Sequence, residues 1–202
     1  MSHSSGHWSK HTMTSSLIPD VDPTRTPWCL LTLRLSDEPE TPRTAPKIVG
    51  WELGDGNPSN LVNTVSYPDE EETNHTALNT LGEQLTERQH EGTLLITASQ
   101  DTIQYLRTNL AYAHLESESV SRRSIDSPVP RPSLHGFRHL PLKDVLENYF
   151  SDSHCLLRQA RIDDSVDLSG EHETPIHPQI MWRLTRTILG LIPIETAQGK
   201  YI

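Results

Sequence analysis

One short apolar run, Thr93–Ala98 (TLLITA), constrains the fold of this 202-residue chain more than any other segment. Six continuously apolar or small residues are too few for an ordinary helix and are typical of a strand buried on both faces. Helical spacing of apolar residues precedes it, from residue 77 to 90, and ends at Gly92. After Ser99, a plausible N-cap, a second apolar stripe spans 103–110. A strand between two helices requires a crossover connection, so the sheet cannot be purely antiparallel.

Three further strands are predicted before this unit. Trp28–Leu35 (WCLLTLRL) begins apolar and then alternates, Lys47–Leu53 (KIVGWEL) follows a proline-rich loop, and Asn60–Val65 (NLVNTV) is short. Gly54–Pro58 (GDGNP) between the last two is a strong turn signal. We therefore expect an α/β fold whose mixed sheet joins a three-strand antiparallel meander to parallel strands and is flanked by helices.

The second half of the chain is predicted to be mostly helix and loop. Glu116–His135 is polar and proline-rich, which predicts a long loop, and Asp163–Pro178 predicts an acidic one. Helical patterns occupy Leu142–Phe150, Cys155–Ile162 and Ile180–Ile192. We expect three parts along the chain: a flexible polar tail (1–26), a single domain (27–195) and a frayed end (196–202).

Charge and composition limit the partners and the environment. Hydrophobic residues make up 34% of the chain and the formal net charge is -10, which opposes nucleic acid and anionic membranes at long range unless a local basic patch exists. Thirteen of the seventeen basic residues are arginines. An acidic, lysine-poor composition resembles that of halophilic proteins that work in concentrated salt. An ordinary acidic protein from a GC-rich genome is the alternative.

The N-terminal residues, the apolar runs and the two cysteines indicate the cellular compartment. Residues 1–26 hold no apolar stretch typical of a secretory leader, and no run approaches the ~18 apolar residues of a membrane span. Cys29 and Cys155 do not form a C-x-x-C pair, so free thiols are expected rather than a disulfide framework. We expect a cytoplasmic protein with no membrane partner.

The order of elements and the stretch Gly92–Leu110 (GTLLITASQDTIQYLRTNL) resemble the ribonuclease H-like fold of DEDD 3′-5′ exonucleases, including the proofreading domains of family B DNA polymerases. The segment His139–Phe150 (HLPLKDVLENYF) is also similar to the one that follows in that family. The resemblance implies that strand 28–35 is central in the sheet and that strand 93–98 is its neighbour.

The resemblance also implies a chemistry, hydrolysis by two divalent metals held by several carboxylates. The family's Asp-x-Glu pair on the first strand falls near Thr32 and Arg34 here, so that pair is absent. Asp101 fits the second motif loosely, and His139 with Asp144 has the H-x-x-x-x-D spacing of the last one. These three are the catalytic candidates, and Asp101 with Asp144 would hold Mg²⁺ or Mn²⁺ only in an active enzyme; otherwise no cofactor is expected.

Each candidate has a simpler interpretation. Asp101 suits the first turn of a helix, and Asp144 with Glu147 suits a solvated helix face. Loop arginines amid acids are usually solvated. The candidates for phosphate contact share a place in or near the predicted loop of the second half: Arg107, Arg122, Arg123 and Arg131. A zinc site would draw on histidines and a thiol with poor spacing: His135, His139, His154 and Cys155.

Three hypotheses follow. The first is an exonuclease-like domain that has lost catalysis and binds nucleic acid or a protein partner, the choice between them being open. The second is an active metal-dependent nuclease with a rearranged site that uses Asp101, Asp144 and either Glu52 or Asp37. The third is a structural or interaction protein with another α/β fold. The sequence leaves the oligomeric state undetermined.

Overall fold

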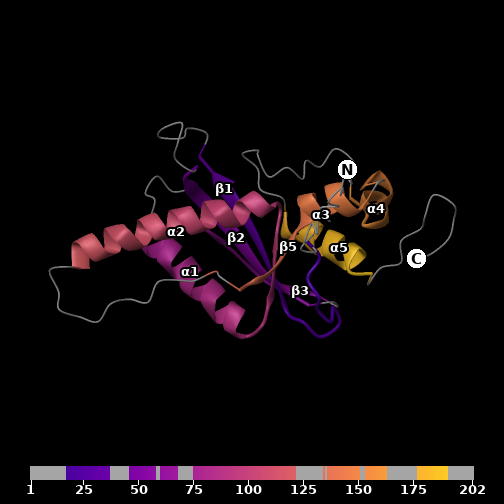
Figure 1. Ribbon diagram of the computed structural model, residues 1–202, viewed down its shortest axis with the longest axis horizontal. Coiled ribbons are helices and arrows are strands. Elements are labelled where there is room, and N and C mark those ends of the chain that lie inside the picture. The colour runs from indigo at the N-terminus through magenta and orange to yellow at the C-terminus, as the bar shows by residue number, and fades with distance from the viewer. Residues whose placement is uncertain are drawn as a thin grey trace, which may run out of the picture.

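A computed structural model describes residues 17–36, 46–57, 60–67, 75–121, 134, 136–150, 153–162 and 177–190. These residues form an α/β structure in which one open sheet has helices on both faces (Figure 1). The elements in chain order are β1 (Trp28–Leu35), β2 (Ile48–Gly56), β3 (Leu61–Tyr67), α1 (His75–His90), β4 (Leu94–Thr97), α2 (Gln100–Ser121), β5 (Arg138–Pro141), α3 (Leu142–Tyr149), α4 (Ser153–Gln159) and α5 (Pro178–Ile188).

The sheet has five strands in the order β3-β2-β1-β4-β5. The pairs β1–β2 and β2–β3 are antiparallel, and the pairs β1–β4 and β4–β5 are parallel, so β2 alone runs against the other four. The expected α/β class and mixed sheet are confirmed. Strand β1 is central because its side chains are apolar on both faces, and the first six of its eight residues are buried.

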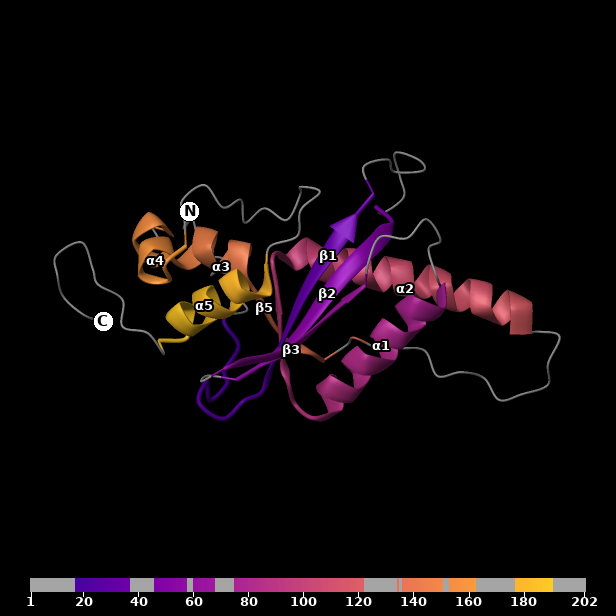
Figure 2. The ribbon, with the colours of Figure 1, turned by 180° about the vertical axis from the view of Figure 1, so that it is seen from behind.

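Alternate residues of the strands point into two separate cores. Leu31, Leu53 and Leu95 pack under α1 and α2, while Trp28, Leu30 and Ile96 pack under α3, α4 and α5. Figure 2, seen from behind, shows α1 and α2 on the far side of β1 and β2. Each fully buried side chain of this size contributes about 1.5–3 kcal/mol, so both faces stabilise the sheet.

Two predicted boundaries are wrong. The turn expected at Gly54–Pro58 begins later, because β2 continues to Gly56, which lies opposite Trp28. A Cβ atom at Gly56 would lie 3.3 Å from Leu30, so the absence of a side chain is what allows the close packing of this face. The loop expected from Glu116 is helical up to Ser121, as the last turn and a half of α2.

One strand was not predicted. β5 lies between the predicted loop, which ends at His135, and the predicted helix, which begins at Leu142. It pairs in parallel with β4, with Leu94 beside Arg138 and Thr97 beside Pro141. Proline ends the strand and β5 lies at the sheet edge, where the missing N–H of proline is tolerated. The predicted helices near residues 142, 155 and 180 are present as α3, α4 and α5.

Helix α1 ends as its sequence predicts, with Gly92 at a φ of 75° that glycine adopts without strain. Within the described ranges, no helix combines the length and the apolar content needed to cross a lipid bilayer.

Candidate functional site

The three catalytic candidates, Asp101, His139 and Asp144, lie near the carboxyl ends of the parallel strands. Strands β1, β4 and β5 are parallel, so their carboxyl ends, at Leu35, Thr97 and Pro141, lie at the same edge. Helix α2 begins directly after β4 and α3 directly after β5. Loops and helix starts beyond the carboxyl ends of parallel strands are the usual place for a ligand in an open α/β sheet. This end of the sheet is therefore the candidate site.

Strand β1 contributes Thr32 and Arg34 to the face that packs under α5. Thr32 is 2% exposed and lies opposite Glu52 of β2. Its hydroxyl oxygen has no hydrogen-bond partner among the described residues. A buried hydroxyl without a partner costs about 1–3 kcal/mol, so this position is not optimised for stability. Glu52, half-buried on the neighbouring strand, is the carboxylate that β2 contributes next to it.

Strand β5 contributes His139, whose Nε2 lies 2.7 Å from the hydroxyl oxygen of Thr97 at the end of β4. The Thr97 hydroxyl donates to the backbone carbonyl of Ser99 at 2.8 Å. Because a hydroxyl has one proton to donate, His139 Nε2 is the donor and Thr97 the acceptor. This fixes the neutral ring as the Nε2–H tautomer.

The pKa of His139 is lowered to about 4. Burial of the ring is the main cause, the Asp144 carboxylate acts in the opposite direction, and the Arg107 guanidinium lowers the pKa further. The imidazole is therefore neutral near pH 7. It serves as a hydrogen-bond donor that holds the turn after β4, and is too weak a base for general-base catalysis at that pH.

Asp144, in the first turn of α3, caps the start of a different helix, α2. Its carboxylate oxygen accepts a hydrogen bond of 2.8 Å from the backbone N–H of Gln100, the first residue of α2. The neighbouring Lys143 N–H donates to the Ala98 carbonyl at 2.8 Å. These two bonds join the start of α3 to the turn between β4 and α2. The carboxylate also lies at the positive end of the α2 dipole.

Asp101 lies in the first turn of α2 and is exposed. His139, Asp144 and Asp101 are thus gathered at one sheet edge. Among the described residues, however, no three His, Cys, Asp or Glu side chains are close enough to hold a metal ion. Two of the three have other structural roles here, one as a donor to Thr97 and one as the cap of α2. Glu147 is exposed on α3, as its simpler interpretation predicted.

Of the four arginines predicted to contact phosphate, only Arg107 lies within the described residues. Arg107 is exposed on α2, and its Nη2 lies 3.4 Å from the Leu134 carbonyl. Arg122, Arg123 and Arg131 lie outside the described residues, as do Asp37 and the zinc candidate His135. The side chain of His154 is likewise not described, and Cys155 is partly buried in α4.

Sequence reasoning missed Thr97. It is fully buried, and its hydroxyl connects β4, β5 and the turn that follows. A threonine inside an apolar run reads as an ordinary strand residue, because the partner that gives it a role, His139, lies on a strand that was not predicted. The period-two alternation of β4 offers the only signal, since it places Thr97 on the same face as Leu95.

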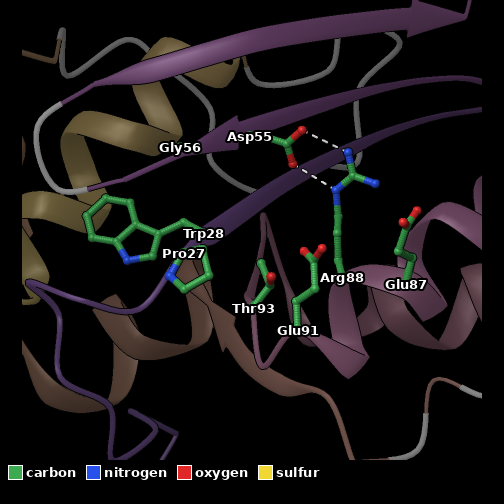
Figure 3. A pocket seen from close by; sticks show the side chains of 8 residues that line it. All are labelled: Pro27, Trp28, Asp55, Gly56, Glu87, Arg88, Glu91 and Thr93. Atoms are coloured by element: carbon green, nitrogen blue, oxygen red, sulfur yellow. Dashed lines mark hydrogen bonds and ion pairs between the residues drawn. The ribbon is translucent and has the colours of Figure 1, made fainter.

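A hollow of about 340 Å³ lies near the other end of β1, lined by Pro27, Trp28, Asp55, Gly56, Glu87, Arg88, Glu91 and Thr93 (Figure 3). Arg88 of α1 forms a two-pronged ion pair with Asp55 of β2, through Nε at 2.7 Å and Nη2 at 2.8 Å. Its Nη1 donates to the Gln84 carbonyl at 3.0 Å. This pair fastens α1 to β2 and raises the pKa of Arg88, chiefly through the hydrogen bonds to Asp55.

Cys29, on the strand next to this pair, offers no nucleophile. Burial raises the pKa of its thiol to about 12, so the reactive thiolate is not populated near neutral pH. Arg88 and Asp55 in this hollow are engaged with each other, which makes their pair a structural junction between α1 and β2. No protein-family model matches this chain, and no curated protein matches it.

Proposed function

We propose that this chain is a ribonuclease H-like domain that lacks the metal-binding carboxylates of the DEDD exonucleases and serves as a nucleic-acid-associated accessory module. Strand order supports the fold assignment. β1 is central, β4 is its parallel neighbour, and β1, β2 and β3 form a meander. This is the arrangement that the resemblance implies, and a different position for either strand would have removed it.

The main evidence for a loss of catalysis is the identity of two residues on the central strand, β1. At the two positions of the family's Asp-x-Glu pair, β1 has Thr32 and Arg34. A two-metal clamp requires several carboxylates that converge on one cleft. A guanidinium at the second position places a positive charge where a cation would need negative charge. The lone hydroxyl of Thr32 cannot replace a carboxylate as a charge-bearing ligand.

The remaining candidates support the same proposal. Asp144 accepts the first N–H of α2, and His139 donates to Thr97. A metal ligand must turn its lone pairs toward the ion, so recruiting Asp144 would cost the cap of α2. The structural roles of Asp144 and His139, capping α2 and donating to Thr97, thus account for both residues without a contribution to catalysis.

The test is a nuclease assay on end-labelled single-stranded DNA and RNA, with Mg²⁺ or Mn²⁺, at low and high salt. The expected result is intact substrate together with salt-dependent binding. Metal-dependent cleavage that is lost in Asp101→Ala and kept in Glu147→Ala would overturn the proposal in favour of an active nuclease with a rearranged site. Absence of both cleavage and nucleic-acid binding would leave the fold assignment standing and remove the proposed role.

A further inference from the structure

A second group of arginines, not singled out from the sequence, lies on α4 and α5. The described segments 153–162 and 177–190 contain four arginines and no Asp or Glu: Arg158, Arg161, Arg183 and Arg186. In a chain of net charge -10, the excess of acidic residues therefore lies elsewhere. Figure 1 shows α3, α4 and α5 gathered at the end of the molecule opposite the far end of α2. We call these four residues the arginine surface.

One contact joins the end of α4 to α5 within the arginine surface. Arg183 Nη1 of α5 lies 3.5 Å from the backbone carbonyl of Arg161, at the end of α4. Arg158 lies one turn before Arg161, whose N–H donates to the Arg158 carbonyl at 2.9 Å. Arg186 lies one turn after Arg183, with its guanidinium 4.8 Å from the centre of the Trp182 ring.

The arginine surface is open to a ligand within the part of the chain that is described. Arg158, Arg161 and Arg183 are exposed, and Arg186 is partly buried. No ion pair joins any of these four guanidinium groups to a described carboxylate, whereas Arg25 pairs with Asp22 and Arg88 with Asp55. Like charges held close together without counter-charges repel one another, a cost that a bound anion would remove.

The backbone conformation at Arg161 indicates that an arginine is kept there for a reason other than stability. The residue adopts a φ of 57°, the only positive φ among the described non-glycine residues. Its N–H bonds to Arg158 and the next N–H, of Ile162, bonds to the Leu157 carbonyl, as at the glycine position of a Schellman helix end. Arginine there costs about 1 kcal/mol relative to glycine, so stability alone does not explain its presence.

We propose that the arginine surface binds the phosphate backbone of a single nucleic-acid strand. Guanidinium groups match phosphate oxygens in a two-pronged geometry and stay charged at any working pH. A strand offers one phosphate per nucleotide, so it can reach charges spread over two helices without having to fold. The Trp182 ring packs against the core, its Nε1–H donates to the Asn57 carbonyl at 3.1 Å, and Arg186 lies over the ring, so Trp182 holds the Arg186 guanidinium in place.

The acidic remainder of the chain gives this surface a second property. A polyanion is attracted at α4 and α5 and repelled elsewhere, so it approaches in one orientation. The inference rests on the proposed function because it names the site through which the accessory module would contact nucleic acid. The arginine surface is separate from the arginines expected from the sequence, of which Arg107, on α2, is the described member.

The experiment compares two double variants of equal charge change by fluorescence anisotropy with labelled oligothymidylate and oligouridylate over a series of salt concentrations. Arg158→Gln/Arg183→Gln removes two exposed charges of the arginine surface. Arg25→Gln/Arg138→Gln removes two exposed charges outside it and is the matched control. Circular dichroism in each buffer checks that all variants are folded.

The surface variant is expected to bind about tenfold more weakly, with a slope of log K against log salt that is smaller by about 1.4, the value for two lost phosphate contacts on a single strand. The control is expected to bind as wild type. Equal weakening in both variants would overturn the inference and leave general nucleic-acid association intact. Tighter binding of polyglutamate than of either oligonucleotide would also overturn it, in favour of an acidic protein segment.

Residues 163–176 join α4 to α5 and contain five carboxylates, so a further variant has all five changed to amides. Wild type is expected to bind oligonucleotide without this change. Binding that appears only in the amide variant would mean that the arginine surface pairs with the chain's own linker, and the inference would be wrong.

Discussion

The carboxylate of Asp144 caps a helix that begins 44 residues earlier, by accepting the N–H of Gln100 at 2.8 Å. The first turn of α3 and the first turn of α2 are therefore one unit. With the bond from Lys143 to Ala98, it fixes where both helices leave the sheet. The residue that resembles a metal ligand in the sequence acts as a distant N-cap in the structure.

Asp144→Ala is expected to lower the free energy of unfolding by about 1 kcal/mol, because the first N–H of α2 loses its acceptor and the helix dipole loses a compensating charge. Asp144→Asn, which keeps a carbonyl acceptor, is expected to lose less. Urea denaturation measures both. Glu147→Ala, on the exposed face of the same helix, is the control and is expected to stay near wild type. Equal losses in Asp144→Ala and Glu147→Ala would mean that the capping bond contributes nothing.

His139 is expected to make stability depend on pH. Its folded pKa of about 4 lies below the ordinary histidine pKa of 6.5, so the unfolded chain binds the proton more tightly. The stabilisation is therefore complete above pH 6.5 and is lost progressively as pH falls toward 4, by up to about 3 kcal/mol.

His139→Gln keeps an N–H that can reach Thr97 and removes the titrating group. Its unfolding free energy is expected to vary much less between pH 6.5 and 4 than that of wild type. His90→Gln, at an exposed position of α1, should keep the wild-type dependence. An NMR titration of the ring proton gives the folded pKa directly, and a value near 6.5 would contradict the prediction.

The pair formed by Arg88 and Asp55 is expected to have a coupling energy of about 1 kcal/mol in a double-mutant cycle with Arg88→Met and Asp55→Asn. The geometry is two-pronged and the Arg88 side chain is 19% exposed, but Asp55 is 44% exposed, so water and salt weaken the attraction. The matched control is the pair of Arg25 and Asp22, with side chains 87% and 52% exposed, where the coupling should be near zero. If the two cycles give the same coupling, the junction between α1 and β2 does not depend on this pair.

Arg161→Gly is expected to raise the free energy of unfolding by about 1 kcal/mol, since glycine adopts a φ of 57° without strain. Arg161→Asn is expected to gain a smaller amount, because asparagine tolerates this region better than arginine. Thermal denaturation measures the change, with Arg158→Gln as a charge-matched control inside the helix. A destabilised Arg161→Gly would show that the side chain contributes packing that outweighs the backbone cost.

The sequence predicted those parts of the fold in which a local pattern and the tertiary structure agree. β1 and β4 are apolar runs that are buried in place, and α1 ends at a glycine with positive φ, as its sequence suggests. β5 could not be predicted, because RHLP has two polar residues and a proline, and only pairing with β4 makes it a strand.

The candidate site was predicted only in part for the same reason. The resemblance named Asp101, His139 and Asp144 as the catalytic candidates, and in the structure they lie near the carboxyl ends of β4 and β5. Their roles depend on partners distant in sequence, namely Thr97 for His139 and Gln100 for Asp144. Motif spacing carries no information about such partners. The arginine surface was missed because its members lie on two helices separated by a long acidic linker.

The position of β1 between β2 and β4 has a consequence for synthesis on the ribosome. The meander of β1, β2 and β3 leaves the exit tunnel before β4 exists, so the most apolar strand of the sheet has one open edge during that interval. Residues Leu94–Thr97 close that edge only after α1 has been made. The nascent meander is therefore the species in which this protein is most exposed to aggregation and to capture by chaperones.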